Sequence, residues 1–183
     1  LFGESELRIA YTGAFSKSYE ATNSMSIIPA EGEACEGKVN AGFTSTDATG
    51  GSIHFAFGNV EASKAEDLLG ADYAVWFTLS ASKLYTGVID LASNANSYTL
   101  RLINYETTKM VENTSKTTGT ITTQISNGKV LIKVDAQLED GTKIVGEYFG
   151  PATQVEDMNV IIPEEKKTNG FKIIGPNGDM ISE

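Results

Sequence analysis

The sequence has little of what most metal and catalytic sites are built from. Its 183 residues include one cysteine, one histidine, one tryptophan and four prolines. A lone cysteine excludes an intramolecular disulfide and a cysteine-rich metal site, and a lone histidine excludes a histidine-rich one. No apolar run approaches the roughly 20 residues of a membrane-spanning helix. We therefore expect no metal, no cofactor and no membrane span.

Basic residues are also scarce. The chain has 14 lysines and arginines against 24 aspartates and glutamates, which gives a formal net charge of −10. Negative charge of this size repels phosphate backbones and anionic lipid, so nucleic acid and membrane surfaces are poor partners. Solubility is the simplest role for the charge.

Catalytic motifs are missing as well. The sequence contains no nucleophile elbow, P-loop or dinucleotide-binding pattern. A Ser-His-Asp triad would have to use His54, which alternation places beside Ser52 and Ala56 on a polar face, as expected for a surface histidine. Cys35 has Glu36 beside it, and because negative charge raises a thiol pKa, we expect an inert cysteine exposed on a loop. No catalytic residue is predicted.

What the sequence does contain is alternation of apolar and polar residues, the pattern of half-buried β-strands. The alternating runs fall at residues 7–15, 52–57, 73–79, 85–91, 98–102, 121–125, 130–138 and 144–148, with a last short strand at 171–174. They predict one all-β domain over residues 1–183, an antiparallel, meander-rich β-sandwich, with a closed lipocalin-like barrel as the alternative. Ser63 and Glu66 form a capping box that predicts one short connector helix ending at Gly70.

Two turns define the clearest part of this pattern. Asn127-Gly128 and Asp140-Gly141 each separate two alternating runs, and these residue types tolerate the positive φ of a type I′ hairpin. Residues 119–149 are therefore predicted to form a three-stranded meander. Its inward-facing residues are expected to include Val130, Ile132, Val134 and Leu138.

The same meander carries a resemblance to known proteins. It contains Gly119-Thr120-Ile121-Thr122, then Asn127-Gly128-Lys129-Val130, and then an Asp-Gly-turn strand that ends in Tyr148-Phe149-Gly150-Pro151. Over about residues 119–151 the chain resembles the closing hairpins of exported, lipid-anchored β-domain proteins of gut anaerobic bacteria. The resemblance implies a periplasmic or cell-surface protein, anchored through a segment outside this sequence, and it supplies no catalytic residues.

One aromatic residue lies out of phase with its strand. If Tyr73, Val75 and Phe77 face inward, Trp76 faces outward, and Arg101 and Tyr105 lie on the corresponding face of the next predicted strand. Aromatic rings beside a guanidinium suit the stacking of a sugar ring or an extended peptide. We therefore predict Trp76, Arg101 and Tyr105 as ligand-binding residues. The alternative is that a loop or the C-terminal segment 158–174 covers this face and makes Trp76 part of a satellite core.

These observations favour a non-catalytic binding or adhesion module of the periplasm or cell surface. Carbohydrate is the favoured ligand class, with a glycan or a surface protein as partner, and the chain is expected to be a monomer or a weak dimer. Two alternatives remain open: a lipocalin-like barrel that binds a small apolar ligand, and a glycan-active enzyme that uses two carboxylates.

Overall fold

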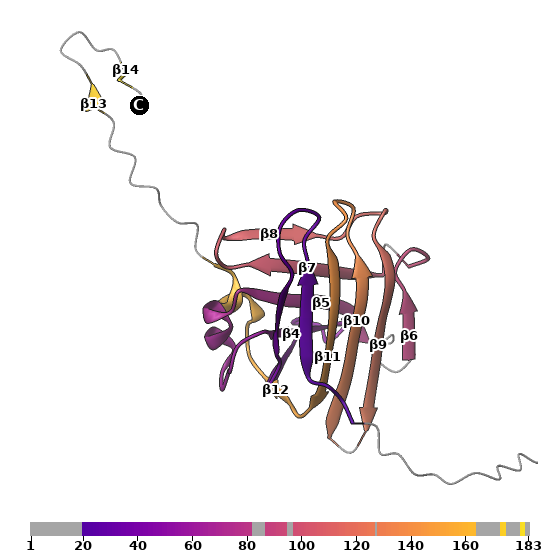
Figure 1. Ribbon diagram of the computed structural model, residues 1–183. Helices are drawn as coiled ribbons and strands as arrows, with labels where there is room; N and C mark the ends of the chain where they lie inside the picture. Colours follow the sequence, from indigo (N-terminus) through magenta and orange to yellow (C-terminus); the bar gives the residue numbers. More distant parts are fainter. Residues whose placement is uncertain are drawn as a thin grey trace, which may run out of the picture.

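The computed structural model describes residues 20–81, 87–94, 97–126 and 128–163, and the backbone of residues 173–174 and 180–181. The predicted strand at 7–15 lies outside these residues. Two six-stranded sheets pack face to face, and their strands run across one another rather than side by side (Figure 1). Near-perpendicular crossing of this kind is one of the two common ways in which twisted sheets pack.

The first sheet, sheet A, has the strand order β2-β1-β11-β10-β9-β6. These strands are β1 (Ser24–Ile28), β2 (Cys35–Lys38), β6 (Gly87–Asp90), β9 (Thr118–Ser126), β10 (Lys129–Gln137) and β11 (Lys143–Gly150). The second, sheet B, has the order β12-β3-β4-β5-β7-β8. Its strands are β3 (Gly42–Thr46), β4 (Ser52–Gly58), β5 (Tyr73–Ser80), β7 (Tyr98–Asn104), β8 (Lys109–Glu112) and β12 (Ala152–Gln154). A separate pair joins β13 (Ile173–Ile174) to β14 (Met180–Ile181).

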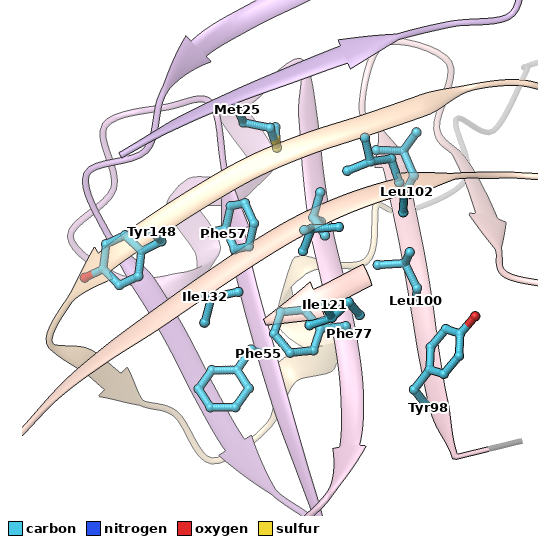
Figure 2. Close-up of a cluster of buried hydrophobic side chains, with 14 of the residues drawn as sticks. Met25, Phe55, Phe57, Phe77, Tyr98, Leu100, Leu102, Ile121, Ile132 and Tyr148 are labelled. Atoms are coloured by element: carbon cyan, nitrogen blue, oxygen red, sulfur yellow. The ribbon is translucent and has the colours of Figure 1, made fainter. Parts of the chain in front are cut away.

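The main core lies between the two sheets. Sheet A contributes aliphatic side chains such as Ile121 and Ile132, and sheet B contributes Phe55, Phe57 and Phe77 (Figure 2). The rings of Phe55 and Phe77 lie 5.4 Å apart between centroids in a stacked arrangement. Inward residues of both sheets recur with a period of two, so a one-residue change of register would expose the whole set.

A tyrosine marks the corner where the chain leaves sheet A for sheet B. Tyr148, near the end of β11, is buried, and its hydroxyl donates a 2.6 Å hydrogen bond to the carbonyl of Pro151. A Cβ added at Gly42 would lie 2.6 Å from Cε1 of this ring, and one at Gly150 would lie 2.5 Å from its hydroxyl oxygen. Two glycines therefore make room for the ring, and β12 can pair in parallel with β3 just beyond it.

The predicted fold class is confirmed. Both sheets have two ends, β2 and β6 in sheet A and β12 and β8 in sheet B, so the described strands form a sandwich and the barrel alternative is wrong. The meander at 119–149 is present as β9, β10 and β11, and Val130, Ile132, Val134 and Leu138 are buried. Six strands were not predicted: β1, β2, β3, β8, β12 and β14.

Two local predictions need correction. The connector is a 3-10 helix, η1 (Ala65–Gly70), and Asp67 rather than Glu66 caps it, because its Oδ2 accepts the backbone N–H groups of Ser63 and Lys64. At the second hairpin only Gly141 has positive φ, so the three-residue loop 139–141 is not a type I′ turn. The backbone N–H of Leu138 donates to the carbonyl of Thr142 across it, as in a type I turn with a glycine bulge.

Helices are few and short in the part of the chain that the structure describes. Besides η1 there is η3 (Met158–Ile161), also a 3-10 helix. Neither has the length or the apolar run that crossing a membrane requires.

The meander generates a stability prediction. Replacing the buried Val134 by Ala removes two methyl groups from the core and should lower the free energy of unfolding by roughly 1–3 kcal/mol. The matched control is Val88→Ala, since Val88 is 62% exposed on edge strand β6 and its change should stay within about 0.5 kcal/mol. Urea unfolding measures both, and equal effects in the two variants would contradict the observed register.

Candidate functional site

The outer face of sheet B, opposite the main core, carries a second apolar cluster. Residues of β3, β4, β5 and β7 meet the two 3-10 helices on this face. The cluster consists of Phe43, Ala56, Ala62, Ala65, Leu68, Ala74, Trp76, Ile103, Met158 and Ile161. The helices therefore cover part of the outer face, and a satellite core forms beneath them.

Trp76 belongs to this satellite core. It lies on the outer face, as the phase of its strand predicted, but only 5% of its surface is exposed. Its solvent-exposed placement, and with it the flat aromatic platform, is therefore wrong, and the alternative of cover by a C-terminal segment is the one observed. The sequence-predicted segment 158–174 contributes Met158 and Ile161 to this cover. Burial of a large apolar ring removes it from water and is favourable. The chain's own residues therefore cover the ring on the outer face of sheet B.

The structure does bring the three predicted residues together. Trp76 pairs with Arg101 across β5 and β7, and the guanidinium carbon lies 4.7 Å from the ring centroid. Tyr105 packs at the margin of the same cluster, and its hydroxyl donates a 2.9 Å hydrogen bond to the carbonyl of Ile161. Burial raises the pKa of Tyr105, so the phenol stays protonated. Trp76 is therefore buried, whereas Arg101 and Tyr105 remain partly accessible at the margin of the cluster.

Arg101 is held in place from two sides. Its Nε donates a 2.8 Å hydrogen bond to Oε2 of Glu112 on β8, while its guanidinium carbon lies over the Trp76 ring. The arginine side chain is 23% exposed and the glutamate 53%. An exposed ion pair of this kind adds little stability, but it fixes the orientation of the guanidinium at the surface.

His54 borders Trp76 on the other side. The indole Nε1 donates to His54 Nδ1 at 3.4 Å, and the Thr78 hydroxyl lies 2.9 Å from the same nitrogen. Because an indole can only donate, Nδ1 is the acceptor and the neutral ring carries its proton on Nε2. Burial lowers the pKa of His54, and the charge of Arg101 lowers it further, against the opposing effect of Asp47 and Asp157.

The outer face of sheet A is different, because it holds an open hollow of about 610 Å³. Its lining comes from β2, β1, β11 and β10. Pairing places Glu36, Ser26, Val145 and Asp135 in one row across these strands, and Lys38, Ser24, Glu147 and Lys133 in the next. Ordinary strand spacings make this surface about 14 Å long and about 7 Å wide.

Within the hollow, each oxygen of one carboxylate has a partner in the protein. Oε1 of Glu147 accepts the backbone N–H of Thr22 at 2.9 Å, and Oε2 lies 3.2 Å from the ammonium of Lys133. Ser26 donates to Glu36 at 3.4 Å, a weak bond. Val145 is 46% exposed in the middle of the row. The hollow therefore combines acceptors, donors and an apolar floor.

Sequence reasoning did not identify this hollow. The outward residues of β10 and β11 could have been read from their alternation, since Lys133, Asp135 and Glu147 lie in phase. The other half of the lining was missed because β1 and β2 have only five and four residues.

Cys35 was predicted to be exposed on a loop, and this is wrong. It begins strand β2 and is only partly exposed, with Asn59 donating to its sulfur at 3.3 Å. Its thiol lies 3.5 Å from Oδ2 of Asp72. Burial raises the pKa of Cys35, and Asp72 raises it further, so the thiol is a poor nucleophile.

Neither outer face assembles a metal site from described residues, since no three His, Cys, Asp or Glu side chains gather closely enough. Comparison with protein-family models, with curated proteins and with solved structures gave no match to this chain. The resemblance of residues 119–151 therefore stays a prediction, and function has to be argued from the geometry of the faces.

The burial of Trp76 predicts its fluorescence. As the only tryptophan of the chain, it should emit at short wavelength and resist quenching by iodide, because the satellite core excludes water from the indole. The same protein unfolded in guanidinium chloride is the control and should emit at longer wavelength with efficient quenching. Similar quenching in the two states would contradict the observed cover.

The environment of His54 predicts a pH dependence. Because the folded pKa is lowered, the unfolded chain binds a proton that the folded chain does not, and stability should fall as the pH drops below about 6.5. The loss should continue until the pH reaches the lowered folded pKa. Denaturant midpoints at about pH 7.5 and 5.5 measure it, a window dominated by histidine. His54→Gln should flatten the difference, and an unchanged pH dependence in that variant would disprove the assignment.

Proposed function

We propose that this protein is a non-catalytic binding module whose ligand is a carbohydrate held on the outer face of sheet A. The observation that carries the proposal is the hollow of about 610 Å³ on this face. Concave surfaces with a few convergent polar groups are the usual places for ligands. A hollow about 14 Å long suits a short oligosaccharide rather than a single small molecule.

The polar groups of the hollow match a ligand rich in hydroxyls. Glu36 and Asp135 accept hydrogen bonds, Lys38 donates them, and the serine hydroxyls of Ser24 and Ser26 do both. Val145 offers an apolar surface to the C–H groups of a sugar ring. One row carries only the acids Glu36 and Asp135, the other combines two lysines with Glu147, and the chain as a whole is negative. These features favour a neutral glycan over an anionic one.

The arrangement favours binding over hydrolysis. Glycosidases place two carboxylates on opposite sides of a scissile bond, about 5–10 Å apart. Glu36 and Asp135 are separated by three strand spacings, about 14 Å between their backbones, and lie on one sheet face rather than on facing walls. Glu147, which lies between them, is bound to Thr22 and Lys133. A glycan-active enzyme is the weaker hypothesis.

We further propose that the module works in the periplasm or at the cell surface, where it binds a glycan or a glycan-bearing surface protein. The support for this is the resemblance of residues 119–151 to exported, lipid-anchored β-domains. A glycan bound on the outer face of sheet A would leave the opposite side of the molecule, which carries η1 and η3, uncovered by the ligand.

Isothermal titration with neutral cello-, xylo-, manno- and malto-oligosaccharides tests the proposal. At least one series should bind, and Ser26→Phe, which fills the hollow, should abolish binding. Asp135→Ala should weaken it about 10- to 100-fold, the effect of losing a hydrogen bond to a charged group. The matched control is Thr153→Phe on exposed strand β12, which should leave the affinity unchanged.

The fluorescence of Trp76 can show which of the two outer faces binds the ligand. A ligand bound beside Arg101 should change the tryptophan emission, because the guanidinium stacks on that ring. A ligand in the hollow lies across the main core and should leave the emission unchanged. Binding that shifts the emission and is lost in Arg101→Met would move the site to sheet B. No binding, or binding that survives Ser26→Phe, would refute the hollow as the site.

A further inference from the structure

Strand β6 ends sheet A on one side, and it is the least protected of the four free sheet edges in the described part of the chain (Figure 1). Proteins usually protect such edges from pairing with charged side chains, above all lysine, or with proline. Strands β2 and β8 each carry a lysine and a glutamate, and β12 has only three residues and follows Pro151. The sequence of β6 is Gly-Val-Ile-Asp, with neither lysine nor proline.

The backbone of β6 presents hydrogen-bonding groups on its open side. β6 pairs antiparallel with β9, and just beyond it the backbone N–H of Leu91 donates to the carbonyl of Gly119. In an antiparallel pair, residues bonded to the neighbouring strand alternate with residues whose backbone groups point away from it. Because Leu91 faces β9, the N–H and C=O groups of Val88 and Asp90 face the open side. Among the described strands, none pairs with them.

The outward side chains at this edge are mostly apolar or uncharged. Val88 is 62% exposed, the highest value among the large apolar side chains of the described residues. Its neighbours on β9 are Thr122, which lies opposite Val88, and Thr120, which lies opposite Asp90. Asp90 carries the one charge of β6, and its Oδ1 accepts the backbone N–H of Ser93 at 2.8 Å. In a chain of net charge −10, a second negative molecule therefore meets little local repulsion at this edge.

We propose that β6 pairs with β6 of a second copy of this chain, so that two copies of sheet A join into one continuous sheet. Equivalent antiparallel strands are related by a twofold axis perpendicular to the sheet, and outward residues then meet outward residues. Such a contact needs only one unprotected edge, because the same surface serves both copies. Main-chain hydrogen bonds supply the affinity, as in other cases of strand addition.

Charge and packing select the register of this pairing. An axis at Asp90 would oppose two carboxylates, which is destabilising. An axis at Ile89 would place Val88 opposite Asp90 of the second copy. With the axis at Val88, the two exposed valines lie opposite each other, about 5.5 Å apart between Cα atoms, and exchange backbone hydrogen bonds. This register covers apolar surface on both copies, so it is the one we expect.

The contact is small, because β6 has four residues. Interfaces below about 1,200 Å² are typical of weak and transient complexes, so we expect a dimer that dissociates on dilution. The axis is perpendicular to the sheet, so the outer faces of both copies of sheet A point the same way. Two hollows of the kind proposed above would then face one glycan chain, which raises avidity without new contacts. The pairing itself does not depend on the glycan proposal.

Sedimentation velocity and ¹⁵N NMR over a range of protein concentrations test the proposal. The wild type should form a dimer as its concentration approaches the millimolar range, and amide signals of β6 should shift in parallel. Val88→Lys places a charge on the edge and should abolish the dimer. The matched control is Val145→Lys, an equal change of charge at an exposed valine of a central strand of the same sheet, which should leave the dimer in place.

Two further variants test the register. Val88→Ile adds a CH₂ group to the contact from each copy and should tighten the dimer about tenfold, an effect that misfolding would not produce. In a Cys35→Ser background, Val88→Cys should give a disulfide-linked dimer on mild oxidation, because Cα atoms about 5.5 Å apart suit a disulfide. Val145→Cys in the same background is the control and should crosslink far more slowly. Denaturant midpoints confirm that each variant is folded.

Three outcomes would overturn the proposal. The first is a wild type that stays monomeric up to millimolar concentration. The second is a dimer that Val88→Lys and Val145→Lys weaken equally, since the contact would then lie elsewhere. The third is slow hydrogen exchange at the amides of Val88 and Asp90 in a monomeric sample, since another part of the same chain would then cover the edge.

Discussion

The structure depends on the contact between the inward faces of two crossed sheets. Aliphatic residues of the β9–β10–β11 meander meet the phenylalanines of β4 and β5 there, and this contact is the main hydrophobic core. Alternation with a period of two commits every second residue to that contact. The remaining surfaces are the two outer faces and the ends where the sheets diverge. They are formed by residues that do not take part in this contact.

The two outer faces are treated in opposite ways. On sheet B a large ring, Trp76, is buried in a cluster with residues of two 3-10 helices, and His54 and Arg101 beside it stay partly accessible. On sheet A no equivalent cover is found among the described residues, and charged and hydroxyl side chains surround the exposed Val145. A face that needs no cover is free to bind something else, which is why the hollow on sheet A supports a ligand better than the aromatic face does.

Prediction from sequence succeeded where the signal was local. The meander, the inward set around Val134 and the outward phase of Trp76 follow from the pleat, which turns neighbouring side chains to opposite faces. It failed for β1, β2, β3, β8, β12 and β14, each of which has five residues or fewer and gives a weak periodic signal. It also failed for Cys35, whose contacts with Asn59 and Asp72 come from segments far along the chain.

The sequence by itself determined that the chain is an all-β protein, which residues point into its core and that the site chemistry must do without a disulfide. The tertiary structure alone decided which outward residues meet solvent. Trp76 and Val145 are both outward and apolar, yet one is buried beneath Met158 and Ile161 while the other is open in a hollow. The physical reason is that the direction of a side chain is set by its own strand, whereas its cover is set by residues far from it in the sequence.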